Sequence, residues 1–136
     1  MNFKYRLVKT LSGKRMAVPA IPIELGENKK IKSYALIDSG ADISVIPLYI
    51  AKYLNLKVEK SIQEISGAGG KVKAVKSKIQ ITLKKGKENH KFNIPVQIAL
   101  TNQELPILLG RKGFFDNFII TFHQSKQSIK LKRTAS

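Results

Sequence analysis

The sequence predicts a mainly β protein with one or two short helices, and three observations support this fold class. Apolar and polar residues alternate with a period of two in several segments, which is typical of strands that bury one face. Helical periodicity is confined to two short stretches, and glycine-rich or charged turn sequences separate the alternating segments. With 136 residues, 43% of them hydrophobic, the chain can bury one core. We therefore expect a single domain over residues 1–136.

The alternation locates the strands and one turn. The charged run 84–89 lies between two alternating segments and predicts a hairpin turn. Apolar positions change parity between Val72 and Ile81, so we expect a bulge or a sharp twist at residues 74–75. The alternating segments are residues 3–7, 79–83, 94–100 and 129–131.

Two short helices are expected. The first runs from Pro47 to Leu54, because proline is favoured in the first turn of a helix and Ile50 lies one turn before Leu54. The second lies near residues 113–117.

Composition excludes several kinds of chemistry. The chain has no cysteine, which excludes disulfide frameworks, thiolate nucleophiles and cysteine-based metal sites. Its two histidines, His90 and His123, are too few for a histidine-rich metal centre, and we expect both on the surface. We predict neither a metal ion nor a cofactor. Acid–base chemistry is left mainly to nine carboxylates.

The formal net charge of +16 suggests an acidic or polyanionic partner: nucleic acid, an anionic membrane surface or acidic peptides. No segment approaches the roughly 20 apolar residues of a membrane span. The apolar run 16–23 contains two prolines and is too short for a signal sequence. We expect a cytoplasmic protein.

Three segments stand apart from this background, and the first is 35–47. An apolar strand ends in Asp38-Ser39-Gly40, after which an apolar run resumes. Burying Asp38 beside apolar neighbours is costly unless hydrogen bonds or a functional role compensate. Asp-Ser-Gly is also ordinary turn sequence, so both a surface turn and an active-site loop fit this segment.

The second segment, 65–72, holds three glycines in four residues between β-prone flanks. It predicts a hairpin tip whose backbone N–H groups can approach a ligand closely. A phosphate-binding loop is the rival interpretation. It is disfavoured because no Gly-Lys-Ser/Thr and no helix start follow the glycines.

The third segment, 105–115, is an apolar strand that runs into Gly110-Arg111 and then a short helix. An arginine directly after a buried strand needs an anionic partner, for which Asp42 and Asp38 are the candidates. A purely structural strand–turn–helix remains the alternative.

Taken together, the three segments resemble the motifs of retropepsins, the retroviral-type aspartic proteases. Residues 38–41 (Asp-Ser-Gly-Ala) resemble the catalytic motif, 65–72 the glycine-rich flap, and 107–111 the apolar–apolar–Gly-Arg motif. Their order and spacing match, and the resemblance covers roughly residues 16–122. The Gly-Phe-Phe at 113–115 is similar to the cellular, non-viral branch. The resemblance implies an acid-protease closed β-barrel with one lobe per chain.

The resemblance also implies roles for individual residues. Asp38 would be the catalytic aspartate, and Ser39 would brace the active-site loop across a dimer. Arg111 would pair with Asp42 and, with Gly110, support the loop structurally. The residues that would contact substrate are Gly40, Ala41, Asp42, Ser66, Gly67, Ala68, Gly69 and Gly70.

Two departures from the family pattern concern basic residues. Lys112 stands where the family usually has Asp or Asn, which affects the hydrogen bonding expected near the helix start. One arm of the flap is also unusually basic; these lysines either form a solvated strand face or attract acidic peptides. They are Lys71, Lys73, Lys76 and Lys78.

A single Asp-Ser-Gly implies a homodimer. An aspartic protease needs two carboxylates, and Gly110-Arg111 has no aspartate where a second copy would need one. We therefore expect two Asp38 side chains on a two-fold axis, sharing one proton and activating a water for direct attack on a peptide bond without a covalent intermediate. Acid to mildly acid pH would favour this reaction.

Two alternatives remain open. The first is a retropepsin-like dimerisation or peptide-binding module that has lost proteolysis. The second is a basic β-domain that binds nucleic acid, which is disfavoured because the glycine-rich segment holds no aromatic side chain for stacking bases. Because the chain starts at its own Met1, we expect independent expression rather than excision from a polyprotein.

Overall fold

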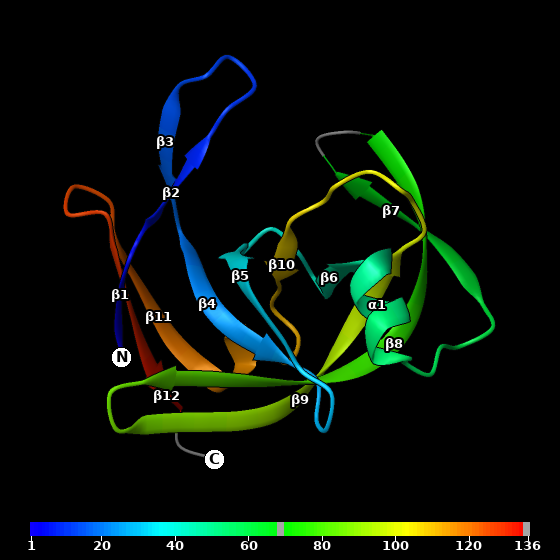
Figure 1. Ribbon diagram of the computed structural model, residues 1–136. Helices are drawn as coiled ribbons and strands as arrows, with labels where there is room; N and C mark the ends of the chain where they lie inside the picture. The colour runs from blue at the N-terminus through cyan, green and yellow to red at the C-terminus, as the bar shows by residue number, and fades with distance from the viewer. Residues whose placement is uncertain (68–69, 135–136) are drawn as a thin grey trace.

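A computed structural model describes residues 1–67 and 70–134, and strands dominate it (Figure 1). The described residues include one α-helix, α1 (Leu48–Leu54), and one short 3-10 helix, η1 (Phe115–Asn117). The mainly β fold class is confirmed. The strands are β1 (Asn2–Lys4), β2 (Arg6–Lys9), β3 (Arg15–Val18), β4 (Ala20–Leu25), β5 (Ile31–Ile37), β6 (Ser44–Pro47), β7 (Ile62–Gly67), β8 (Gly70–Lys85), β9 (Glu88–Ala99), β10 (Ile107–Leu109), β11 (Phe118–His123) and β12 (Ser128–Arg133).

Seven strands form the main sheet, in the order β4-β5-β10-β6-β9-β8-β7. A further pairing joins β4 to β8 through Glu24 opposite Thr82 and Leu25 opposite Ile81. This pairing closes six of the strands into a β-barrel, as the retropepsin resemblance implies. Because β4 and β8 lie at opposite ends of the six-stranded order, closure leaves neither with an open edge there.

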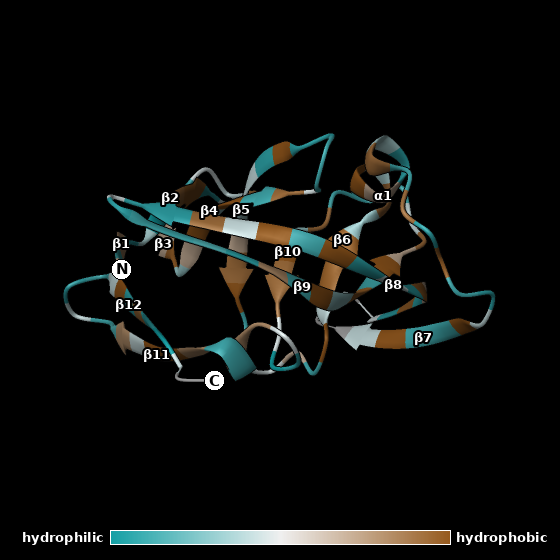
Figure 2. Cartoon of the chain, turned by 90° about the horizontal axis from the view of Figure 1, so that it is seen from below, coloured by the Kyte–Doolittle hydropathy of each residue, from teal (hydrophilic) through white to brown (hydrophobic). Residues whose placement is uncertain are grey.

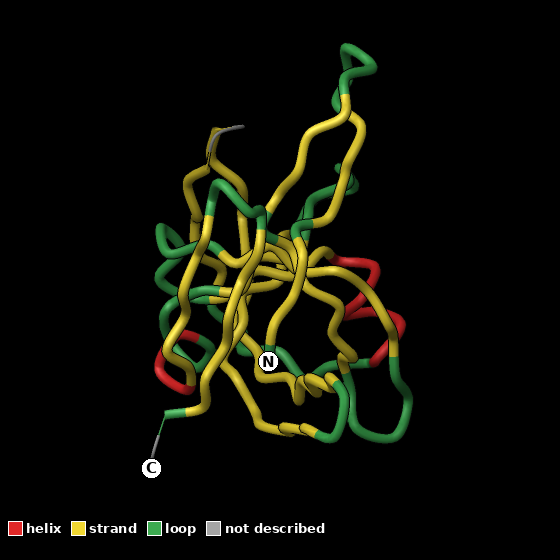
Figure 3. Tube along the Cα trace, turned by 90° about the vertical axis from the view of Figure 1, so that its left-hand side faces the viewer, coloured by secondary structure: helices red, strands yellow, loops and turns green. Residues whose placement is uncertain are grey.

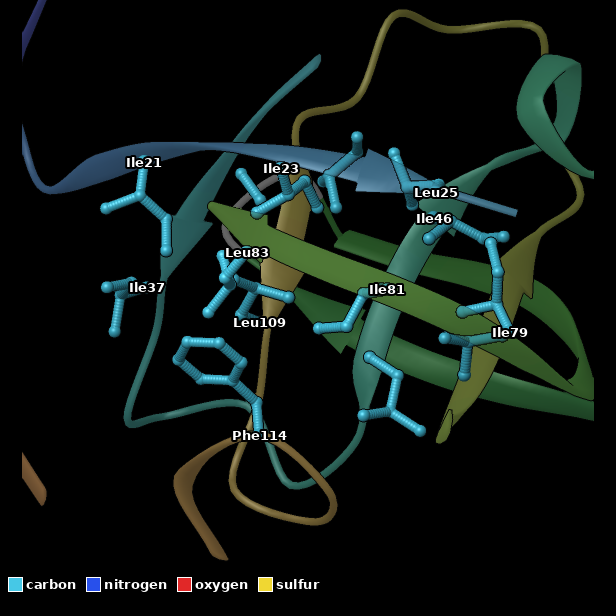
Figure 4. Close-up of a cluster of buried hydrophobic side chains, with 14 of the residues drawn as sticks. Ile21, Ile23, Leu25, Ile37, Ile46, Ile79, Ile81, Leu83, Leu109 and Phe114 are labelled. Atoms are coloured by element: carbon cyan, nitrogen blue, oxygen red, sulfur yellow. The ribbon is translucent and has the colours of Figure 1, made fainter. Parts of the chain in front are cut away.

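The core fills the barrel with apolar side chains from β4, β5, β6, β8 and β10, together with Phe114 (Figure 4). Hydropathy alternates along the strands, with brown segments next to teal ones (Figure 2). Ile21, Ile81 and Leu83 are fully buried. Each such side chain contributes about 1.5–3 kcal/mol of transfer free energy when it leaves water.

Two smaller sheets flank the barrel. One has the order β1-β12-β11, and the other is the hairpin β2–β3, whose strands pair only with each other among the described residues. The hairpin projects away from the barrel, as Figure 1 and the side view in Figure 3 both show. The alternation expected over 3–7 is thus divided at Tyr5 between two sheets.

The helices and the charged turn lie where the sequence predicts them. Helix α1 begins after Pro47 and ends at Asn55, which has left-handed backbone angles (φ 51°, ψ 51°). The expected second helix is the single 3-10 turn η1. The hairpin at 84–89 joins β8 to β9, with Lys85 opposite Glu88.

The bulge considered at residues 74–75 is absent, because the pairing of β8 with β7 and β9 is continuous through these positions. The apolar parity changes for a different reason. In the flap portion Val72 faces the cavity described below, whereas further along Ile79 and Ile81 face the barrel core. These are opposite faces of one strand, so β8 buries first its even and then its odd positions.

No helix in the described part of the chain is both long enough and apolar enough to span a membrane.

Candidate active site

The active-site loop, residues 38–42, is positioned by two adjacent parallel strands. Strand β5 pairs with β10, Ile37 opposite Leu109, so both strands end at the same edge of the sheet. The Asp38 N–H donates to the carbonyl of Leu109 at 3.0 Å. The Arg111 N–H donates to the carbonyl of Ala41 at 2.9 Å. The segments that the sequence singled out, 35–47 and 105–115, are therefore in direct contact. We call the place where their backbones meet, at residues 38–43 and 109–111, the crossing.

Gly110 makes this crossing possible. A Cβ atom at this position would lie 2.8 Å from the carbonyl oxygen of Ala41 and 2.8 Å from the carbonyl carbon of Ile43. Both atoms belong to backbone, which cannot move aside cheaply. The Gly110 N–H donates to Oγ of Ser44 at 2.9 Å, and Ser44 is fully buried. Ser44 was not predicted to support the site, because nothing in the local sequence pattern distinguishes it from an ordinary strand residue.

Asp38 itself is half-buried and lines a mainly apolar cleft. Its Oδ1 accepts a hydrogen bond from the Gly40 N–H at 2.9 Å. Residues 39–40 form a turn, so the turn and the active-site interpretation of Asp-Ser-Gly are compatible. The turn presents the Asp38 carboxylate to the cleft and keeps one of its oxygens hydrogen-bonded.

Arg111 lies beside the loop. Its Nη1 donates to the carbonyl oxygen of Ser39 at 2.7 Å, and its Nη2 lies 3.6 Å from Oδ1 of Asp42. Lys112 adds a second cation, with Nζ 3.6 Å from Oδ2 of Asp42. All three charged side chains are more than half exposed, so these ion pairs position the loop more than they stabilise the fold.

The cavity beside Asp38 has a volume of about 650 Å³. One wall is the active-site loop, and the opposite wall is the tip-proximal part of the β7–β8 hairpin, which the sequence predicts to be the flap. Gly67 and Gly70 are paired at the described end of that hairpin, and Ala68 and Gly69 lie outside the described residues. The residues that line the cavity are Asp38, Gly40, Ala41, Asp42, Ile43, Val45, Ile65, Ser66, Gly70, Val72, Gln97, Gln103, Leu105, Pro106 and Leu108.

The third wall of the cavity, from β9 and residues 103–108, was not predicted from the sequence. Leu108 carried no signal, because Ile107-Leu108-Leu109 is uniformly apolar in the sequence and only the structure shows Leu108 to be half-exposed. Gln97 carried a usable signal, as the polar position between apolar Val96 and Ile98. Residues 103–105 belong to a loop, where alternation gives no information.

The cavity differs electrostatically from the rest of this basic chain. Its lining includes two carboxylates, Asp38 and Asp42, and no lysine or arginine among the described residues. In residues 1–67 and 70–134 no group of three His, Cys, Asp or Glu side chains is placed to hold a metal ion. The site thus offers carboxylate chemistry in a mainly apolar cleft.

Residues 21–112 match the family model described as "Aspartyl protease", which spans the active-site loop, the flap and the Gly-Arg motif. The chain belongs to this family, and its fold is retropepsin-like.

Two solved structures share that fold. A retropepsin-like aspartic protease from Rickettsia conorii is 16% identical with a TM-score of 0.59, over 95% of this chain and 97% of that one. The EIAV protease, in complex with the inhibitor HBY-793, is 23% identical with a TM-score of 0.53, over 76% of this chain and 88% of that one. No curated protein matches the sequence.

Proposed function

We propose that the protein is an aspartic endopeptidase that works as a homodimer, in which each chain contributes Asp38 to one shared catalytic pair. The observation that carries this proposal is the Asp38 carboxylate at a cleft of about 650 Å³ whose opposite wall is the flap hairpin. Asp42, the other carboxylate in the lining, is engaged by Arg111 and Lys112. A second free carboxylate therefore has to come from another copy of the chain.

The chemistry follows from placing two carboxyl groups close together. Two carboxylates a few ångströms apart cannot both ionise comfortably, so the pair shares one proton and titrates as a unit. The ionised Asp38 takes a proton from a bound water, and the protonated one hydrogen-bonds the scissile carbonyl oxygen. The water attacks the carbonyl carbon, and the resulting tetrahedral intermediate collapses as the leaving nitrogen is protonated.

The β7–β8 hairpin supplies the flap in this proposal. It reaches beyond the barrel (Figure 1). Ile65, Ser66 and Val72 of this hairpin line the cleft. A peptide bound as an extra strand between the flap and residues 40–42 would form backbone hydrogen bonds with both. Closure would then exclude bulk water from the reacting groups.

The test is cleavage of a diverse peptide library between pH 3 and pH 7, comparing the wild type with Asp38→Asn. We expect the substitution to reduce kcat/KM by at least about 10³-fold while the protein stays folded and dimeric, since it removes the acid–base pair. Glu27→Gln, which removes an exposed carboxylate away from this cleft, is the matched control. A statine-type transition-state mimic should block the wild type.

Two results would overturn the proposal. A strictly monomeric wild type that still cleaves peptides could not be using an Asp38 pair. A well-folded dimer that cleaves nothing would instead support the peptide-binding module. Size-exclusion chromatography with light scattering, run on the same samples, distinguishes these cases.

A further inference from the structure

A second hollow of about 700 Å³ lies next to the cavity at Asp38 and has the opposite electrostatic character. We call it the lysine hollow: it is lined by Lys57, Lys76, Lys78 and Lys112, with Glu59 as its one carboxylate. Its lining also includes apolar side chains, among them Val58, Pro95 and Val96. The hollow therefore combines several cations with surface that can pack against a peptide.

The lysine hollow adjoins the cavity. Ile43 lines both. Lys76 of β8 pairs with Gln97 of β9, and residues paired across strands share a face, so a lysine of the hollow neighbours a residue of the cavity. Lys112 in the hollow lies 3.6 Å from Asp42 in the cavity. The hollow and the cavity therefore meet at Ile43 and at the contact between Lys112 and Asp42.

The wall of the hollow is fixed by hydrogen bonds that tie the segment after α1 to β8. The Ser77 hydroxyl donates to the Lys57 carbonyl oxygen, and the Glu59 N–H donates to the Lys76 carbonyl oxygen at 3.0 Å. Ser77 is buried. The segment carrying Lys57 is thus anchored alongside Lys76 and Lys78 and does not hang free in solvent.

The positive charge of the hollow is poorly compensated. Within residues 1–67 and 70–134, Lys57, Lys76 and Lys78 form no salt bridge, although Glu59 lines the same hollow. Lys112 shares Asp42 with Arg111. Unpaired cations around one concave surface raise the local concentration of anionic groups.

The four lysines of the flap arm therefore divide into two pairs. Lys76 and Lys78 lie on the even face of β8, the face that Val72 presents to the cavity, and both line the hollow. Lys71 and Lys73 occupy the odd face and line neither the hollow nor the cavity. The first pair is placed to meet a substrate, and the second pair provides a control on the same strand.

We propose that the lysine hollow binds Asp or Glu side chains of the peptide substrate, at positions flanking the residues that occupy the cavity. This rests on the proposed endopeptidase function and names its substrate class: peptides that are apolar at the cleavage site and acidic on either side. Both sides are implicated because a symmetric dimer presents one hollow at each end of its shared cleft. A peptide is favoured over nucleic acid because the lining contains no aromatic side chain on which bases could stack.

The test starts from any library peptide that the wild type cleaves. Each position two to five residues from the scissile bond is replaced in turn by Asp, Asn or Lys, and kcat/KM is measured at low and at 1 M salt. We expect Asp to be preferred over Asn by about fivefold at one or more positions on each side, because each exposed ion pair contributes modestly. The preference should fall to about one at 1 M salt, where the screening length is about 3 Å.

Two double variants show whether the lysine hollow is responsible. Lys76→Gln with Lys78→Gln should reduce the Asp-to-Asn ratio to between about one and two. Lys71→Gln with Lys73→Gln removes the same charge from the other face and should leave the wild-type ratio. Cleavage of the Asn peptides should change little in either variant, so a loss of folding is not mistaken for a loss of selectivity.

The outcomes separate this proposal from the proposed function. Cleavage without an Asp preference, or with one that survives in Lys76→Gln/Lys78→Gln, overturns the lysine hollow and leaves the protease intact. If the wild type cleaves nothing, fluorescence anisotropy with the Asp and Asn peptides decides: equal affinities overturn the proposal, and an Asp preference lost in Lys76→Gln/Lys78→Gln supports it. Single-stranded RNA that binds the hollow more tightly than any Asp peptide would also overturn it.

Discussion

The two walls of the cleft are held by different kinds of contact. The active-site loop is held by residues that are distant in sequence. Backbone groups of Leu109 and Arg111 form hydrogen bonds with it, and the Gly110 N–H donates to Ser44, which follows the loop. The flap is held mainly by the backbone hydrogen bonds between its own two strands, because β7 pairs only with β8 among the described residues. Ile62 at its base is 61% exposed.

This difference shows how one site can combine precision with access. A reacting carboxylate must be held to within a fraction of an ångström, which requires neighbours that are themselves fixed by packing. A lid must open for a peptide to enter, which requires few contacts beyond its own hairpin. Substitutions on the loop wall should therefore reduce stability and activity together, and those on the flap mainly activity.

Gly110→Ala should have the largest effect. The added Cβ would lie 2.8 Å from a backbone atom of Ala41 and 2.8 Å from one of Ile43, so the crossing has to open. We expect a loss of about 1–3 kcal/mol in the free energy of unfolding, as for other overpacked interiors, and loss of peptide cleavage. Lys126→Ala, at an exposed turn position far from the loop in sequence, is the control. Denaturant unfolding that leaves Gly110→Ala as stable as Lys126→Ala would contradict a close approach of backbone at Gly110.

Ser44→Ala should come next. It removes the hydroxyl that accepts the buried Gly110 N–H and leaves that donor without its partner. An unsatisfied buried donor costs about 1–3 kcal/mol, and we expect activity to fall along with stability. Ser61→Ala, at an exposed position, serves as the control. Equal denaturation midpoints for the two variants would show that the bond between Ser44 and Gly110 contributes little.

A valine on each wall gives a direct comparison. Val45 and Val72 both line the cavity, but Val45 is buried in β6 whereas Val72 is only partly buried in the flap portion of β8. Val45→Ala should lower the free energy of unfolding by about 1–2 kcal/mol, and Val72→Ala by less than about 0.5 kcal/mol. We expect Val72→Ala to reduce kcat/KM several-fold nonetheless. Equal stability losses would mean that the flap is packed as firmly as the loop.

Glu88→Gln should have the smallest effect, because Glu88 lies at the far hairpin and contacts neither wall. A hydrogen bond with His90, and then the N-terminal ammonium, lower the pKa of Glu88 below its ordinary value of 4.5. A lowered pKa stabilises the folded state above the unfolded pKa, and this contribution disappears as the pH falls through the folded pKa. The Tm of Glu88→Gln should thus be slightly below that of the wild type at pH 6, and the difference should be smaller at pH 3. A difference that is the same at both pH values would contradict the linkage.

The sequence determined the local structure and the identity of the three motifs. Alternation located parts of β8, β9 and β12, Pro47 marked the start of α1, and Asn55 tolerates the left-handed backbone that ends it. Asp38-Ser39-Gly40 is recognisable as an active-site motif because carboxylate, hydroxyl and glycine follow an apolar strand directly. Such features depend on neighbours within a few residues, which is the information that a linear sequence carries.

Only the tertiary structure decided which distant residues complete the site. Ser44 contacts Gly110 across 66 residues of chain, and Gln97 reaches the cavity because β9 lies beside β6. The division of the flap lysines into substrate-side and outer pairs depends on which face of β8 is buried at each point. The physical reason is that a strand has two faces and two edges, and the order in which strands pair determines what each of them contacts.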